Sequence, residues 1–377
     1  MQRSERHWGG VVRRNHLIIL GSAVVTAAIA AVFTWHVSGL PTHRPDFAMM
    51  WRALQLPNPY DRAALDAALH WEAKYPVAFV YPPTALPIFG LFSLLTLRAA
   101  LTLWATLSAG SLALAARSKW TPLLLLTPSL LWAIPGGQTS VLIGSILLGS
   151  LLLLRDRPWL SGVLLGVALS LKPQLALAFP LLLLIDRRWH ALIAAIGTFL
   201  GAALLSAVLF GPLEWVEWIR SLPGFIDLHA SNPLLRRNEI ALGLPLWLRA
   251  CAIAIGAWAS ARALQRGNRV EAFVIASCAG LIGSAHAMGY EFAMLAPACP
   301  ALIAKRGWAA SAIFLFLLIP GFIWFGLPAF PSRLVAVLAL WSAAAVDGVF
   351  AERPASKAAS AAMPRDRADR AIGERCA

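Results

Sequence analysis

Apolar residues fill most of the chain in long runs that short polar segments separate. The first run spans residues 16–35, and later runs follow one another closely from about residue 77 to residue 350. A helix of about 20 apolar residues matches the thickness of the bilayer core. Because the runs are continuous and do not alternate apolar with polar positions, they predict helices and exclude a membrane β-barrel. The pattern therefore predicts an all-α polytopic membrane protein.

The apolar runs differ in length, and the short ones indicate helices that do not cross the membrane completely. Those at 121–134, 159–171 and 175–185 are too short to cross a bilayer upright. Short broken helices are tolerated at membrane depth where they line a cavity. We also expect the run at 77–97 to be re-entrant or incomplete, which leaves a bundle of about 12 transmembrane helices among thirteen runs.

Basic residues gather in short clusters between the apolar runs and set the expected topology. The net charge is +14, although only 13% of the residues are charged and 59% are hydrophobic. That composition excludes a soluble domain of this length. Basic clusters are typical of cytoplasmic loops, and four arginines precede the first run. We therefore expect a cytoplasmic N-terminus and no nucleic-acid partner.

Residues 41–83 form the longest polar interruption and are expected to lie outside the cell membrane. Asp46 and Asp61 are each placed to cap a short helix, over 46–56 and 61–74, and both helices would lie along the membrane surface. A second outer loop, at 211–238, contains the amphipathic stretch EWVEWIRSLPGF.

The chain is expected to form one membrane-embedded domain over residues 1–352. The remaining residues, 353–377, are rich in Ala, Arg and Ser and are expected to form a disordered cytoplasmic tail.

The apolar runs are broken at 135–138 and at 172–174, and we expect both breaks on the same side of the membrane as Asp46. Three polar residues at or near these positions each have a structural and a chemical interpretation. Asp46 is placed to cap a helix, to act as a general base at the membrane surface, or to do both. Lys172 has no acidic neighbour in the sequence, and it either reaches the lipid headgroups or holds a phosphate. Gln138 follows two glycines, and its amide either caps a turn or binds a sugar or phosphate.

Further candidates lie at the ends of later runs. His286 and Tyr290 are expected on the same side of the membrane as Asp46, where they either pack or contact a substrate. Arg236 and Arg237 lie outside, against the usual charge distribution, and bind either lipid headgroups or an incoming phosphate.

Aromatic residues of the first outer loop have two interpretations as well. Tyr60, Trp71 and Tyr81 suit either an interfacial aromatic belt or a platform for a sugar ring. The four cysteines show no spacing that predicts a disulfide or a metal site. No nucleotide motif, metal cluster or other cofactor site is evident.

Seven short motifs, taken in order, resemble glycosyltransferase family 87. They are P-D-F at 45–47, N-P-Y-D at 58–61, Y-P-P at 81–83, G-G-Q-T-S at 136–140, L-K-P-Q at 171–174, R-R-N at 236–238 and S-x-H-x-x-x-Y at 284–290. The resemblance covers roughly residues 16–350. The family consists of integral-membrane C-type glycosyltransferases that use a polyprenyl-phosphate sugar, usually mannose, on the non-cytoplasmic side.

The resemblance implies roles for residues at the matching positions. Asp46 would be the general base of an inverting transfer, and the donor or acceptor site would be lined by Tyr81, Gln138, Lys172, Asn238 and His286. Such a transfer needs a base for the acceptor hydroxyl and cations for the departing phosphate. The late motif lacks the proline and extra aromatic residues often seen around this histidine in the family.

Three hypotheses follow. The first is a cell-membrane mannosyltransferase, or a close hexosyl equivalent, that acts from a polyprenyl-phosphate donor on a lipid or glycan acceptor. The second is a secondary transporter or lipid flippase, which broken helices around polar groups would suit, although no internal repeat is visible. The third is another C-type enzyme, such as a protein O-mannosyltransferase, which differs in its acceptor.

Overall fold

The computed structural model describes residues 2–40, 43, 45–69, 78–232, 240, 244–284 and 286–305. Every regular element within these ranges is a helix, which confirms the all-α prediction for that part of the chain. The apolar runs at 308–327 and 333–350, and the tail at 353–377, lie outside the described residues.

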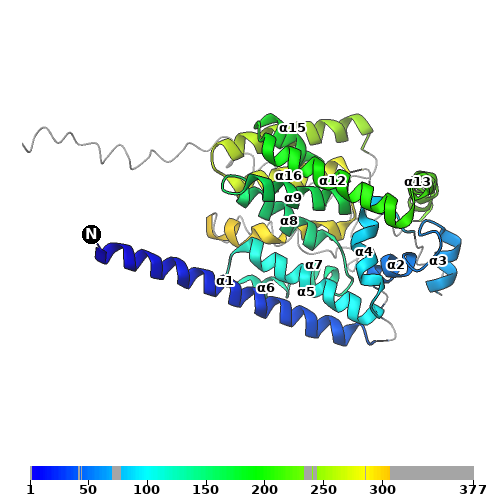
Figure 1. The fold of residues 1–377 in the computed structure, drawn as a ribbon, viewed down its shortest axis with the longest axis horizontal. Helices are drawn as coiled ribbons and strands as arrows, with labels where there is room; N and C mark the ends of the chain where they lie inside the picture. The colour runs from blue at the N-terminus through cyan, green and yellow to red at the C-terminus, as the bar shows by residue number, and fades with distance from the viewer. Residues whose placement is uncertain are drawn as a thin grey trace, which may run out of the picture.

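Several helices pack side by side along their lengths and form a bundle (Figure 1). α1 (Gln2–Val37) lies along α5 (Leu97–Ala116), and α9 (Pro158–Leu171) lies along α12 (Trp189–Phe210). α8 (Ser140–Leu153) contacts both α5 and α9 and so joins the two pairs at the centre.

The later helices complete the bundle on its other side. α15 (Leu246–Gln265) packs against α16 (Arg269–Gly283), and the 3-10 helix η2 (Gly289–Ala298) packs against α8. The core of the bundle is apolar, with Trp104 and Phe273 among its largest fully buried side chains.

The expected count of about 12 crossings is not confirmed. Among the described residues, three helices are long and apolar enough to cross a membrane: His16–Val37, Leu97–Ala116 and Trp189–Phe210. The other apolar helices are shorter than a bilayer requires. A helix of 14 residues such as α8 is about 21 Å long, whereas the hydrocarbon core is about 30 Å thick.

The short helices arise where proline and glycine interrupt apolar sequence, as the run lengths predicted. Residues 83–93 form the 3-10 turn η1 and one short helix, too short to span, which agrees with the expected incomplete run. The interrupted elements are η1 (Pro83–Ala85), α4 (Leu86–Ser93), α6 (Thr121–Leu124), α7 (Pro128–Ala133), α10 (Pro173–Ala176) and α11 (Ala178–Ile185).

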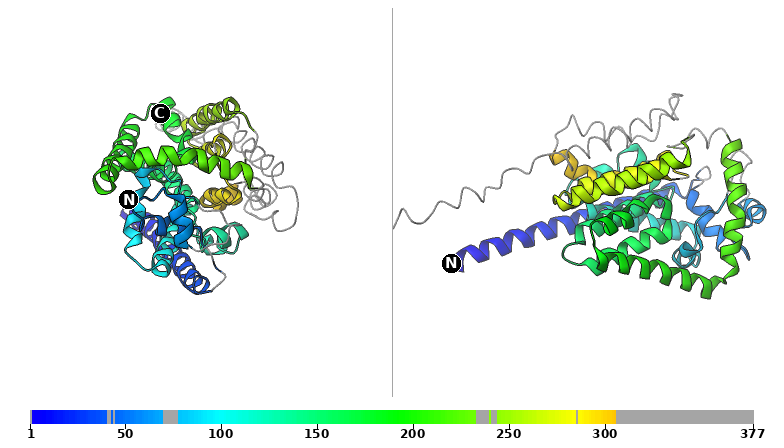
Figure 2. Two further views of the ribbon diagram at one scale, coloured as in Figure 1. Left: turned by 90° about the vertical axis from the view of Figure 1, so that its right-hand side faces the viewer. Right: turned by 90° about the horizontal axis from the view of Figure 1, so that it is seen from above.

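One end of the bundle carries the helices of the two predicted outer loops. α2 (Asp46–Ala53) and α3 (Arg62–Leu69) follow α1 there, in place of the expected helices over 46–56 and 61–74; residues 70–77 are not described. α13 (Leu213–Ser231) follows α12 after Gly211 and Pro212 and lies crosswise over the same end (Figure 2).

Basic clusters mark the opposite ends of the same helices. Lys119 follows α5, Arg155 follows α8 and Arg266 follows α15, whereas α9, α12 and α16 begin just after basic residues. Each of these helices therefore runs between a basic cluster and the end that carries α2, α3 and α13.

Gly144 allows η2 to approach α8 closely. A Cβ atom at this position would lie 1.9 Å from the backbone oxygen of Met294. Because a backbone atom cannot move aside as a flexible side chain can, this position excludes any side chain.

We expect Gly144→Ala to destabilise the protein by about 1 to 3 kcal/mol or more, because the added methyl group would force η2 away from α8. Thermal unfolding in detergent measures the change. Gly201→Ala in α12 is the matched control, since nothing lies within 4 Å of its Cβ position. Equal loss of stability in the two variants would contradict the packing argument.

Candidate functional site

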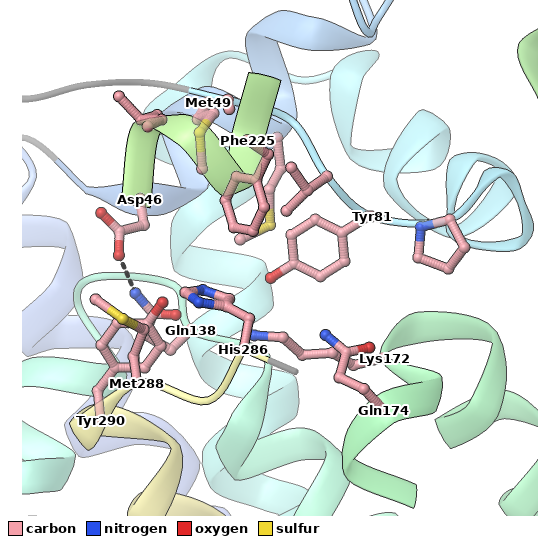
Figure 3. A pocket seen from close by; sticks show the side chains of 15 residues that line it. Asp46, Met49, Tyr81, Gln138, Lys172, Gln174, Phe225, His286, Met288 and Tyr290 are labelled. Carbon is pink, nitrogen blue, oxygen red and sulfur yellow. Dashed lines mark hydrogen bonds between the residues drawn. The ribbon is translucent and has the colours of Figure 1, made fainter. Parts of the chain in front are cut away.

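Six of the ten candidate residues line one cavity at the end of the bundle that carries α2 and α13 (Figure 3). The cavity has a volume of about 150 Å³, enough for several water molecules or a polar group of a substrate. These six are Asp46, Tyr81, Gln138, Lys172, His286 and Tyr290. The predicted breaks at 135–138 and 172–174 therefore do share a side with Asp46.

Asp46 is the first residue of α2, and its carboxylate accepts a hydrogen bond from the side-chain amide of Gln138. The prediction that it caps the helix is wrong, because Pro45 takes the cap position and no side chain bonds the helix start there. Asp61, in contrast, caps α3 as predicted, since its Oδ1 accepts a hydrogen bond of 3.0 Å from the Ala64 backbone.

The glycine turn before Gln138 fits tightly against the start of α2. The Phe47 amide donates to the Gly136 oxygen at 3.1 Å, which joins the two segments through the backbone. Gly137 has a φ of 69°, and a Cβ there would lie 2.4 Å from that of Phe47. Only glycine meets both requirements, and this close approach brings the Gln138 amide to Asp46.

Burial raises the pKa of Asp46 to about 6, because the charged form loses its hydration. The hydrogen bond from Gln138 and the positive charge of Lys172 lower the pKa in part, and the negative charge of Glu291 raises it. The carboxylate is therefore mostly ionised at neutral pH and suited to accept a proton.

Lys172 lies in the break between α9 and α10 and forms an ion pair with Glu291 of η2. The Lys172 residue is only 7% exposed, so it does not reach the lipid headgroups as one interpretation required. Its Nζ lies 5.6 Å from the ring centre of Tyr81 and 5.9 Å from that of Tyr290. Both rings contribute cation–π attraction to the buried charge.

Tyr60 lies behind the cavity instead of lining it. Its hydroxyl donates to the Tyr81 backbone oxygen at 3.0 Å, and its ring packs against Phe79. Tyr60 is buried and is not among the residues that line this cavity, so its proposed role as a platform for a sugar ring stays a prediction. Tyr81 lines the cavity, and its hydroxyl lies 3.3 Å from the Thr139 hydroxyl. Trp71 is not among the described residues.

His286 reaches the cavity from the segment between α16 and η2, and Tyr290 reaches it from the first turn of η2. The His286 ring meets the ring of Phe225 edge-on, with 4.9 Å between centres and 90° between planes. The Ser284 hydroxyl bonds both the oxygen and the amide of His286, at 2.6 and 3.1 Å, and so fixes its backbone. Arg236, Arg237 and Asn238 lie outside the described residues, so their predicted contacts remain untested.

α13 covers the cavity and is tied to the first outer loop. Its residues Phe225 and Leu228 line the cavity. The Trp218 indole donates to the Val80 oxygen at 3.2 Å, and Asn58 donates to Glu217 at 3.4 Å. The amphipathic helix expected in the second outer loop therefore forms one wall of the site.

Sequence reasoning missed several cavity residues and the partner of Lys172. Met49 and Met50 line the cavity three and four residues after Asp46, where the helix period places them on the same face. Gln174 belongs to the same K-P-Q motif as Lys172. Glu291 is the only acidic residue between 272 and 346, and a buried lysine needs such a partner, which was the available signal.

The cavity combines a proton acceptor with a buried cation. Among the described residues, no group of three His, Cys, Asp or Glu side chains is placed to hold a metal ion. The side chains in the cavity can supply proton transfer at Asp46 and the binding of an anion at Lys172.

Comparison with known proteins agrees with the motif resemblance. The model of glycosyltransferase family 87 matches residues 79–288, which is more than half of the chain. A Mycobacterium tuberculosis protein named polyprenol-phosphate-mannose-dependent alpha-(1-2)-phosphatidylinositol mannoside mannosyltransferase is 25% identical over 280 residues. The alignment covers 64% of this chain and 65% of that relative, so the chain spans slightly less than two thirds of the relative's length. No solved structure matches the chain.

Of the six predicted residues that line the cavity, the matched range includes Tyr81, Gln138, Lys172 and His286, whereas Asp46 and Tyr290 lie outside it. The match favours the glycosyltransferase hypothesis over the transporter or flippase. With its helical fold, its apolar helices and more than half of its length matched, the chain belongs to glycosyltransferase family 87.

Proposed function

We propose that this protein transfers a hexose, most simply mannose, from a polyprenyl-phosphate sugar to a hydroxyl group of a lipid or glycan acceptor, with inversion at the anomeric carbon. The observation that carries the proposal is that the Asp46 carboxylate and the Lys172 ammonium face one cavity in a family 87 chain. The name of the mycobacterial relative supports the donor and the sugar.

In the proposed reaction, the acceptor oxygen attacks the anomeric carbon while Asp46 takes its proton. The bond from that carbon to the phosphate oxygen breaks, and the electron pair leaves with the polyprenyl phosphate. Lys172 lies where it can bind this developing negative charge. The raised pKa of Asp46, about 6, suits a base that works near neutral pH.

The arrangement of the side chains supports inversion. Figure 3 has Asp46 on one side of His286 and Lys172 on the other. Inversion requires that the acceptor and the leaving group lie on opposite faces of the sugar ring. A sugar bound between the two charged groups, beside Tyr81 and His286, would meet this requirement.

The apolar part of the cavity suits a lipid-linked donor. Met49, Phe225 and Leu228 also line it, and they offer a surface for the first isoprenoid units. α13 carries exposed apolar residues on its outer side, including Leu213, Ile219 and Ile226, which suits a helix that lies in the membrane interface.

The basic clusters support a cavity on the non-cytoplasmic face. They follow α5, α8 and α15 and precede α9, α12 and α16, at the helix ends remote from Asp46 and Lys172. Positive clusters favour the cytoplasmic side, which assigns the cavity to the other side in this proposal.

Replacement of the proposed base tests the reaction. Asp46→Asn is expected to lower the transfer rate by about 100-fold or more, because the amide cannot accept the proton. The assay uses purified protein, polyprenyl-phosphate mannose and glycolipid acceptors, with a serine-containing peptide to detect a protein O-mannosyltransferase. Asp66→Asn on α3 is the control, since this carboxylate is exposed and pairs with Arg62. A normal rate in Asp46→Asn would end the assignment of the base.

The pH dependence tests the role of Gln138. The wild-type kcat/KM is expected to rise with pH through about 6, because only the deprotonated Asp46 is active. The amide of Gln138 stabilises the carboxylate, so Gln138→Ala should raise the pKa of Asp46. The rising limb of the profile should then move to higher pH. A profile that keeps its midpoint in the variant would argue against this hydrogen bond in catalysis.

A further inference from the structure

The cation of the cavity is already paired. The ammonium of Lys172 contacts Oε1 of Glu291, a residue that lies 119 positions later in the chain. Lys172 lines the cavity, whereas Glu291 is not among the lining residues and is 1% exposed. Glu291 therefore holds Lys172 from the protein interior, and an anion in the cavity would meet the same ammonium from the other side.

The pair leaves one carboxylate oxygen unsatisfied. Oε2 of Glu291 is buried without a hydrogen-bond partner among the described residues. A buried carboxylate that serves only stability normally has both oxygens bonded, because an unpaired buried oxygen is costly. A lysine ammonium has three donors, so Lys172 can bind Glu291 and a second oxygen anion together.

We propose that Glu291 is a resident counter-ion that competes with the lipid-linked phosphate for Lys172 and so limits how tightly the enzyme holds its product. The inference rests on the proposed function, since it assumes that the cavity binds a prenyl phosphate. Glu291 is a positioning residue in this role, because it acts through Lys172 and does not touch the reacting atoms.

The need for such a residue follows from the charges of the donor and the product. A polyprenyl-phosphate sugar is a phosphodiester with one negative charge, whereas the released polyprenyl phosphate is a monoester that carries up to two. A buried, uncompensated lysine would hold the product more tightly than the donor, because attraction grows with charge in a medium of low polarity. The negative charge of Glu291 opposes that preference and favours release.

Neutralising the counter-ion tests the inference. Glu291→Gln keeps the shape of the side chain and removes its charge, so a prenyl phosphate of fixed chain length should bind about tenfold tighter or more. In turnover, the KM for the donor should fall, product inhibition should increase, and kcat should fall where release limits the rate. The prenyl alcohol of the same length should bind all variants equally.

Glu271→Gln is the matched control. Glu271 of α16 is also buried and paired with a lysine, Lys305, but neither residue lines the cavity. This variant should bind the prenyl phosphate as the wild type does. Glu291→Asp keeps the charge but withdraws it by one methylene group, so it should tighten binding less than Glu291→Gln. If Glu291→Gln does not fold, the binding measurement on Glu291→Asp tests the inference in its place.

The outcomes separate this inference from the proposed function. Unchanged or weaker binding in both Glu291 variants, together with lost binding in Lys172→Met, would overturn the counter-ion role and leave Lys172 as the phosphate partner. A wild-type protein that binds no prenyl phosphate would overturn both. If Glu271→Gln tightened binding as much as Glu291→Gln does, the counter-ion role would also be overturned. The effect would then come from the loss of any buried negative charge and not from a carboxylate next to Lys172.

Discussion

Burial of the Lys172 charge is the constraint on which the site depends. A lone ammonium among apolar helices would cost several kcal/mol, so the fold must bring an acid and polarisable groups to it. Glu291 and the rings of Tyr81 and Tyr290 meet that need. They come from two distant segments, and their convergence draws η2 and the Y-P-P segment to the break between α9 and α10. The geometry of the cavity is thus a consequence of satisfying one charge.

Interrupted helices make this convergence possible. Irregular backbone is unfavourable in lipid and is accepted only where protein or water satisfies its polar groups. The breaks at 135–138 and 172–174 both open on the cavity, whereas α12 runs unbroken and exposes Leu204 and Val208 along its outer face. Similar apolar composition therefore builds the lipid-facing wall where it is continuous and the site where proline or glycine interrupts it.

The helices, the breaks and the shared side of Asp46, Gln138 and Lys172 could be predicted from the sequence. They depend on the length of each apolar run and on the basic residues next to it, which can be read from neighbouring positions.

Contacts between segments that lie far apart in the sequence could not be predicted in this way. The pairing of Lys172 with Glu291 joins residues 119 positions apart, and the Tyr60 hydroxyl bonds a backbone oxygen 21 positions away. Asp46 was predicted to cap a helix, but the nearby Gln138 amide binds its carboxylate instead. The number of membrane crossings also could not be derived from the sequence, because an apolar run can form a helix such as α8 that is too short to span the bilayer.

Asp46 and Glu291, the two carboxylates at the cavity, differ in what surrounds them, and this difference separates their proposed roles. Asp46 is bonded by a neutral amide and is buried enough to bring its pKa to about 6, which leaves it able to gain and lose a proton near neutral pH. Glu291 contacts the Lys172 ammonium and does not line the cavity, so an acceptor hydroxyl bound there would meet Asp46 and not Glu291. In the proposed reaction, proton transfer therefore occurs at Asp46 and anion binding at Lys172, and Glu291 takes part only through Lys172.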